Sequence, residues 1–330
     1  MTWGTCTGIA AMLGAALAIF TPPAHAEKVT VHDKLGRTIT LEAPVKRAVL
    51  FETYELLPAL GSWDRIAGLS RYAFDNDLIR AVRPNVRDEI ADVGAMSDMN
   101  VERLLALRPD VVVGWNLSPQ AAAFLDAKGI PVVLLNPQTL EELEQTLRIE
   151  GTLFGKPAEA ERVIAAMRSM MGKAAERTRD IPEDQRRRAL WMMGKPTAVG
   201  ARHSVGAQAL EAVGLRNVAA ELDQPWVEVP VERILAWNPD AVFIWGWARF
   251  EPADILNAPH WRNMAAVRSG SVWKTPRWST WSPRVAPMAL WMAAKAYPDH
   301  FRGFPVTAEI DAFFRQVYGI PYSRVAPLDP

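Results

Sequence analysis

Two glutamates stand in matching surroundings of this chain, about 130 residues apart. Glu102 is the second residue of the segment 101–115, and Glu232 is the second residue of the segment 231–245, which matches the first at nine of fifteen positions. Two surface carboxylates can guide and orient a docking partner through charge complementarity. Pro230 has the place of a first-turn helix proline, so each glutamate also falls where the helix dipole alone favours an acid. Both interpretations remain open, and the repeat itself predicts two similar lobes with a cleft between them.

Aromatic side chains form the second set of interest. Twelve tryptophans follow residue 26, and nine of them lie between residues 226 and 291. A buried indole needs a partner for its N–H group, so a core uses few tryptophans, whereas clefts for large planar ligands use many. Ligands of open α/β sheets bind beyond the carboxyl ends of the strands. The candidate ligand contacts that follow expected strands are Glu52, Tyr54, Tyr72, Trp115, Met193, Trp247, Trp278, Trp281 and Arg284.

Two arginines are candidates for a specific interaction with a ligand. Arg249 and Arg284 could each bind carboxylate or catecholate oxygens through two parallel hydrogen bonds. Because Arg284 directly follows Pro283, it could equally brace its own loop. The residues alone leave both roles of Arg284 open.

Composition excludes several classes of protein. Lys and Arg number 37, as do Asp and Glu, so no basic field is present to bind nucleic acid. The single cysteine, Cys6, lies within the first 26 residues, so the rest of the chain has no disulfide or cysteine-based metal site. Its histidines are scattered, unlike the clustered ligands of a bare-metal receptor. We therefore expect no resident cofactor or protein-held metal. A metal would arrive inside a chelate, although Glu52 could complete an open iron site.

The sequence also lacks the common catalytic motifs. It contains no Gly-X-Gly-X-X-Gly, no phosphate-binding loop, no His-Glu-X-X-His and no Gly-X-Ser-X-Gly. An exported α/β enzyme would need a nucleophile–base pair or a dinucleotide loop, and a redox or chelatase domain would need cysteines or clustered histidines. Both classes remain alternatives to a binding protein. Turnover of a substrate would favour the enzyme, and absorbance of a bound chelate would favour the binding protein.

Short apolar strands that alternate with helices predict an α/β fold. The apolar run 9–20, followed by an Ala-X-Ala site, indicates a signal peptide cleaved after Ala26 and export to a periplasm. Helical spacing from Val163 to Met171 belongs to a helix of about 20 residues, long enough to join two lobes. The predicted organisation is a signal peptide over 1–26, an N-terminal α/β lobe over 27–155, a connecting helix over 156–182 and a C-terminal α/β lobe over 183–330. Each lobe is expected to be Rossmann-like, with a parallel sheet.

Residues 27–330 resemble the periplasmic solute-binding proteins of ABC importers for iron–siderophore, haem and cobalamin. The resemblance rests on both copies of the repeat, on Glu-Leu-Leu-Pro-Ala-Leu-Gly at 55–61 with Arg-Ile-Ala-Gly-Leu at 65–69, and on Gly-Leu-Arg-Asn at 214–217. It implies two α/β lobes joined by a single long helix, with the ligand in the cleft between them. These markers are specific for the family and not for the ligand.

The resemblance also implies roles for individual residues. In the family one glutamate of each lobe docks onto arginines of the membrane permease, which by motif position implies Glu102 and Glu232. Trp226, and Met96 in the other lobe, correspond to positions that contact the ligand. His203 lies in a loop near the cleft, although exposed histidines without a visible partner are common. The expected function is a monomeric periplasmic receptor that delivers a metal chelate to an ABC permease. A ferric siderophore is the first expectation, and haem or cobalamin are the alternatives.

Overall fold

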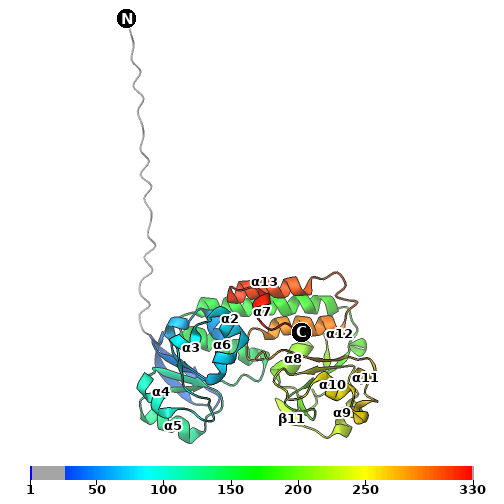
Figure 1. The fold of residues 1–330 in the computed structure, drawn as a ribbon, viewed down its shortest axis with the longest axis horizontal. Helices are drawn as coiled ribbons and strands as arrows, with labels where there is room; N and C mark the ends of the chain where they lie inside the picture. The colour runs from blue at the N-terminus through cyan, green and yellow to red at the C-terminus, as the bar shows by residue number, and fades with distance from the viewer. Residues whose placement is uncertain (2–26, 329–330) are drawn as a thin grey trace.

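The computed structural model describes Met1 and residues 27–328, which form two α/β lobes side by side (Figure 1). The first lobe has a five-stranded sheet in which all neighbouring strands are parallel. Its strands are, in spatial order, β5 (Ala91–Asp92), β4 (Ile66–Leu69), β3 (Ala48–Leu50), β6 (Val111–Gly114) and β7 (Val132–Leu134). An antiparallel hairpin of β1 (Glu27–His32) and β2 (Thr38–Ala43) precedes the sheet. The expected signal-peptide cleavage after Ala26 lies outside the described residues.

The second lobe has a mixed sheet, which differs from the expected parallel one. Its spatial order is β11 (Trp226–Glu228), β9 (Ala198–Gly200), β8 (Arg188–Met192), β12 (Ala241–Ile244) and β13 (Val272–Lys274), and β10 (Arg216–Asn217) also pairs with β8. The pairs of β8, β12, β13 and β10 are parallel, whereas β9 runs antiparallel to both β8 and β11. The reason is the short turn between β8 and β9, where Met193 N–H donates to the Ala198 carbonyl at 2.8 Å. A parallel pair needs a crossover of about a dozen residues or more, and this turn is too short.

Helices cover the sheets and connect the lobes. The first lobe contains α1 (Leu56–Leu60), α2 (Asp77–Val82), α3 (Val86–Glu89), α4 (Val101–Leu107), α5 (Pro119–Ala127) and α6 (Leu140–Leu153). The remaining helices are α7 (Pro157–Thr178), α8 (Val205–Ala212), α9 (Val231–Trp237), α10 (Pro252–Leu256), α11 (Ala265–Arg268), α12 (Val285–Ala296) and α13 (Val306–Tyr318). Single 3-10 turns lie at Trp63–Arg65, Arg71–Asp75, Glu183–Gln185, Pro259–Trp261 and Tyr322–Arg324. None of the described helices is both long and apolar enough to cross a membrane.

The long helix α7 runs along one side of both lobes, with α13 beside it (Figure 1). Its 22 residues span about 33 Å at 1.5 Å per residue. The C-terminal segment returns from the second lobe to the first. There the Arg324 guanidinium donates to the Ala81 carbonyl at 2.8 Å, and the Ala326 N–H donates to Asp77 at 3.0 Å. The lobes are thus joined by α7 and also by the C-terminal segment.

The repeated Pro-Asp pair has a structural role in each lobe. The Asp110 carboxylate accepts the backbone N–H of Arg47, just before β3, at 2.9 Å. The Asp240 carboxylate accepts the backbone N–H of Arg188, at the start of β8, at 2.9 Å. The side chains of these two arginines in turn donate to the last carbonyls of α4 and α9. In each lobe, the repeated unit is therefore hydrogen-bonded to the start of the central strand, both through its Asp and through the end of its helix.

The largest cluster of buried apolar residues runs through both lobes. Alternate residues of each central strand face it, among them Leu50 on β3 and Trp191 on β8, while Val49 and Leu190 face separate outer clusters. This alternation follows from the period-two geometry of a strand buried on both sides. The inner core also includes α1, α7, α12 and α13, so the two lobes share one buried interior.

Candidate functional site

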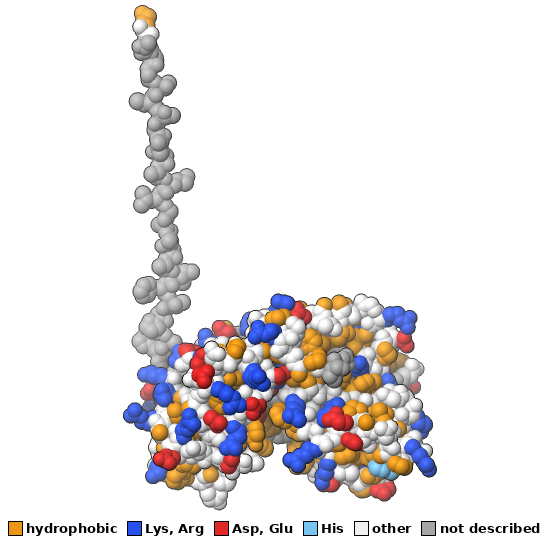
Figure 2. All heavy atoms as spheres, in the orientation of Figure 1, with side chains coloured by type: hydrophobic (Ala, Val, Ile, Leu, Met, Phe, Trp, Pro, Cys, Tyr) orange, Lys and Arg blue, Asp and Glu red, His pale blue; other side chains and the backbone are white. Residues whose placement is uncertain are grey.

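A cleft of about 820 Å³ lies between the lobes. Eight of the eleven sequence-predicted ligand contacts line it: Glu52, Tyr54, Tyr72, Trp115, Met193, Trp226, Trp247 and Trp281. The notch between the free ends of the lobes is visible in Figure 2, with hydrophobic side chains at its inner end. The strands β3, β6, β8 and β12 end at the cleft, so the rule that ligands bind beyond carboxyl ends of strands places most of these residues together.

Five tryptophans line the cleft, and three of them are unusually accessible: Trp226 is 59% exposed, Trp247 is 38% exposed and Trp115 is 36% exposed. Large apolar side chains that gather on an exposed, concave surface indicate a binding site. Trp115 of the first lobe and Trp281 of the second meet edge to face, with ring centroids 5.6 Å apart. The aromatic wall therefore extends across both lobes.

One of the two glutamates that line the cleft is Glu52, which follows β3. Burial, and then the nearby Glu55, raise the pKa of Glu52 to about 8, and a hydrogen bond from the Thr53 backbone opposes the shift. Burial also raises the pKa of Tyr54, with Glu52 and Glu55 adding to the shift. At neutral pH the protonated form of Glu52 is therefore favoured, in which the carboxyl can donate a hydrogen bond.

Polar residues that sequence reasoning missed also line the cleft. They are Glu55, Asn116, Asn136, Gln138, Lys195, Ser204 and Thr280. Asn116 follows β6, Asn136 and Gln138 follow β7, and Lys195 follows β8, so the strand-end rule could have found them. Ser204 precedes α8 and carries no comparable signal. These groups provide hydrogen-bonding positions on an otherwise aromatic surface.

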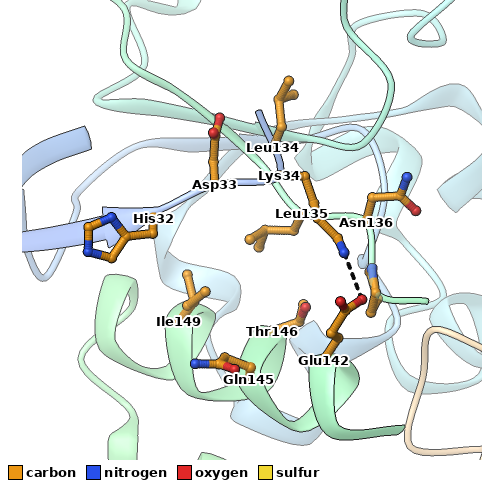
Figure 3. Close-up of a pocket in the computed structure, with 11 residues that line it drawn as sticks. His32, Asp33, Lys34, Leu134, Leu135, Asn136, Glu142, Gln145, Thr146 and Ile149 are labelled. Atoms are coloured by element: carbon orange, nitrogen blue, oxygen red, sulfur yellow. Dashed lines mark hydrogen bonds and ion pairs between the residues drawn. The ribbon is translucent and has the colours of Figure 1, made fainter. Parts of the chain in front are cut away.

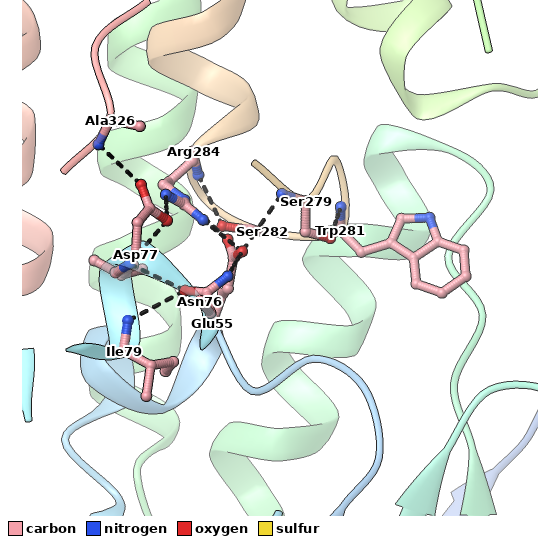
Figure 4. Close-up of polar contacts among 10 residues, drawn as sticks. Glu55, Asn76, Asp77, Ile79, Ser279, Trp281, Ser282, Arg284 and Ala326 are labelled. Atoms are coloured by element: carbon pink, nitrogen blue, oxygen red, sulfur yellow. Dashed lines mark hydrogen bonds and ion pairs between the residues drawn. The ribbon is translucent and has the colours of Figure 1, made fainter. Parts of the chain in front are cut away.

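Arg284 and Trp278 do not reach the cleft surface. Both are wholly buried, and the Arg284 guanidinium lies over the Trp278 ring at 4.9 Å. Arg284 donates through Nε to Glu55 at 2.9 Å and through a terminal nitrogen to Asp77 at 2.7 Å (Figure 4). Burial alone would lower the pKa of Arg284, but the two carboxylates raise it above its usual value. Of the two roles open to Arg284, the geometry corresponds to bracing, and in this arrangement neither side chain can contact a ligand.

The Arg284 contacts join the two lobes beneath the cleft. Glu55 also accepts hydrogen bonds from the Asn76 side chain at 2.7 Å and from the Ser279 backbone at 3.4 Å. Glu55 and Ser279 both line the cleft, whereas Asp77 binds the C-terminal segment. We call Glu55, Asp77 and Arg284 the interlobe clamp. It ties the floor of the cleft to the junction of the lobes.

Three further candidates lie away from the cleft lining. Met96 packs beside Gly114, where an added Cβ would come within 2.0 Å of the Met96 methyl group. His203 is partly buried and pairs with Asp223 at 2.8 Å, and Arg249 is exposed but does not line the cleft. Within the described residues no group of three or more His, Cys, Asp or Glu could hold a metal ion.

A second hollow, of about 240 Å³, lies in the first lobe between the β1–β2 hairpin and α6 (Figure 3). Its lining combines the apolar Leu135 and Ile149 with an ion pair between Lys34 and Glu142 at 2.8 Å. This hollow is less than a third of the volume of the cleft, and its charged groups are already paired, since Asp33 binds Arg37 at 2.6 Å. The interlobe cleft is therefore the candidate site.

Glu102 and Glu232 occupy equivalent exposed positions, each in the first turn of its helix, α4 or α9. These helices lie on the side of the two lobes opposite α7 (Figure 1). The arrangement gives the protein two matched carboxylates on one face, one for each lobe. It is compatible with both a docking role and a helix-dipole role.

The comparisons with known proteins agree with this architecture. The family model of the periplasmic binding proteins matches residues 48–277. The molybdate-binding protein MolA of Haemophilus influenzae is 24% identical over 323 residues, which cover 89% of each chain. The vitamin B12-binding protein of Salmonella typhimurium is 28% identical over 217 residues, 64% of this chain and 76% of that one. The structure of Helicobacter pylori CeuE in complex with nickel and histidine has a TM-score of 0.78 at 25% identity, and the match covers 90% of this chain and 98% of CeuE.

The chain belongs to the family of periplasmic binding proteins, which are the substrate-binding components of ABC importers. Members of this family work with the permease subunits of ABC transporters and bind small molecules. The expected family and fold are thereby confirmed.

Proposed function

We propose that this protein captures a metal chelate with an aromatic or apolar face, a ferric siderophore in the first instance, and delivers it to an ABC permease. The observation that carries the proposal is the composition of the cleft, in which five tryptophans and two tyrosines form the wall. Flat or apolar ligands gain most from such a surface, because aromatic rings bury large areas and stack. The metal would arrive within the ligand, and the protein would act as a monomer in the periplasm.

The cleft is poorly suited to a small bare oxyanion. Lys195 is the single Lys or Arg among its described lining residues, and the lining also includes two glutamates. An oxyanion is stabilised by cations at close range, and a single lysine beside two glutamates supplies little positive charge. The relative MolA is named for molybdate, and this chemistry argues against the same ligand here. A corrinoid, as in the vitamin B12-binding relative, remains the second candidate because it is also large and flat.

Quenching of tryptophan fluorescence tests the proposal directly. The purified chain would be titrated with ferrichrome, a ferric tris-catecholate, haemin, cyanocobalamin and molybdate. We expect saturable quenching by one of the chelates and none by molybdate. Trp226→Ala should weaken binding, whereas Trp237→Ala should not, because Trp237 lies outside the cleft and donates to Glu221 at 2.8 Å. Saturable binding of molybdate alone, or of no compound in the panel, would sink the chelate proposal.

Delivery to the permease is proposed to involve Glu102 and Glu232. Both are exposed, on helices that lie on the same side of the two lobes, and neither forms an ion pair with another described residue. Two carboxylates at a fixed separation favour one orientation of a basic partner over others. The rigid junction of the lobes would keep that separation constant.

A further inference from the structure

The turn that carries Glu52 contains a residue with a strained backbone. Of the three described non-glycine residues with positive φ, Arg108 and Asn238 end helices, whereas Thr53, at φ 60°, lies between β3 and α1. A β-branched residue is rarely found in this left-handed region, because its side chain crowds the backbone. Thr53 separates Glu52 from Tyr54, and both of these line the cleft. Strain of this kind persists only where the surrounding structure enforces it.

The group that holds Thr53 is Glu150, on α6. Glu150 is wholly buried, and its carboxyl forms a hydrogen bond with the Thr53 hydroxyl, 97 residues away in the sequence. The same hydroxyl also contacts the Glu52 carbonyl. A hydroxyl has one proton and a carbonyl can only accept, so both contacts are satisfied when Thr53 donates to Glu52 and a protonated Glu150 donates to Thr53. Burial raises the pKa of Glu150 to about 8, which agrees with this assignment.

The buried carboxyl of Glu150 lowers the stability of the fold, which indicates a role in the site. Its second carboxyl oxygen is buried without a hydrogen-bond partner among the described residues. A buried carboxyl with an unsatisfied oxygen destabilises a fold, and an apolar residue of similar size would fill the same space without that cost. A buried polar group that lacks a hydrogen bond calls for an explanation. Holding the backbone in a conformation that it would not otherwise keep is such an explanation.

We propose that Glu150 is a positioning residue of the ligand site, which holds Thr53 in the left-handed conformation and thereby presents Glu52 and Tyr54 to the cleft. The inference rests on the cleft being the ligand site, but the turn itself can be tested without a ligand. A glycine at position 53 would adopt the same conformation without support. The proposal therefore makes a specific demand: Thr53→Gly should remove the need for Glu150.

The first experiment measures amide hydrogen exchange in residues 51–57 of the unliganded protein. Glu150→Leu should accelerate exchange there by about tenfold, since the strain of one such residue corresponds to roughly that factor in an equilibrium. Glu150→Gln, which can still donate to Thr53, should match the wild type. The double variant Thr53→Gly with Glu150→Leu should return to wild-type exchange. Wild-type exchange in Glu150→Leu, or no recovery in the double variant, would overturn the proposal.

The second experiment uses ferrichrome, the ferric tris-catecholate, haemin or cyanocobalamin, whichever quenches the wild type. Glu150→Leu should bind the chelate about tenfold more weakly than the wild type, and its unfolding midpoint should not fall. A merely structural role of Glu150 would lower both the affinity and the unfolding midpoint. If Glu150→Leu fails to fold, Glu150→Met removes the same hydrogen bond, fills a similar volume and should give the same two results. If none of the four chelates binds the wild type, the chelate function fails, whereas the exchange result still decides the role of Glu150.

Discussion

Replacement of Arg284 by methionine tests the interlobe clamp. The Arg284 side chain is wholly buried and forms three hydrogen bonds with Glu55 and Asp77. Methionine fills much of the same volume but leaves the buried Glu55 carboxylate without a cation. Removal of one partner from a buried ion pair costs about 3–5 kcal/mol. The exposed pair of Arg302 with Asp299 offers a matched control, for which we expect no measurable change.

Urea unfolding followed by tryptophan fluorescence measures this penalty at pH 7. At pH 7 we also expect a fall in melting temperature of roughly 10 °C, since 1 kcal/mol corresponds to about 2–4 °C in proteins of this size. The double variant Glu55→Gln with Arg284→Met should recover most of the stability, because no charge remains unpaired. A penalty no larger than that of the exposed control pair, or a double variant as unstable as the single one, would refute the reasoning.

Three further predictions follow from the same structure. Glu150→Gln should flatten the decline of stability between pH 4.5 and 8 by up to about 1.4 kcal/mol per pH unit in urea unfolding, because the wild-type folded state retains on Glu150 a proton that the unfolded state releases, whereas glutamine does not titrate. Glu102→Lys with Glu232→Lys should abolish transport and leave chelate affinity unchanged in fluorescence titration, so a loss of affinity would argue against docking. Asp110→Ala and Asp240→Ala should each lower the unfolding free energy by about 1 kcal/mol, and clearly unequal effects would contradict the equivalence of the two repeats.

Local patterns predicted much of the fold because local interactions determine it. Each copy of the repeat became a helix, a turn and the strand beside the central strand of its sheet, and the Asp contacts show why the same residues recur. The long helix was expected from apolar spacing and is observed as α7, Pro157–Thr178. The antiparallel β9 was missed because Met193 to Ala198 was not recognised as a tight turn, and a turn of that length reverses the chain.

The sequence placed cleft residues correctly where the position of a residue along a strand decides whether its side chain is exposed. Trp115, at the end of β6, reaches the cleft as the rule requires. Trp278 follows β13 in the same way but turns into the core, where it packs beside Phe314 with ring centroids 5.5 Å apart. The partner of Arg284 lies 229 residues away, so no local pattern could indicate the pairing. Burial of a loop depends on such distant contacts, and a single sequence does not specify them.

The interlobe clamp also limits how this protein can respond to its ligand. Separation of the lobes would break contacts of a wholly buried arginine, at a cost of about 3–5 kcal/mol. A ligand can shift a conformational equilibrium only by the difference between its affinities for the two states. Rotation of the exposed Trp226 and Trp247 costs far less, so adaptation to a ligand should occur in the side chains of the cleft. We therefore expect small-angle scattering curves of the free and chelate-loaded protein to superimpose, whereas a clear fall in the radius of gyration on loading would show that the clamp opens.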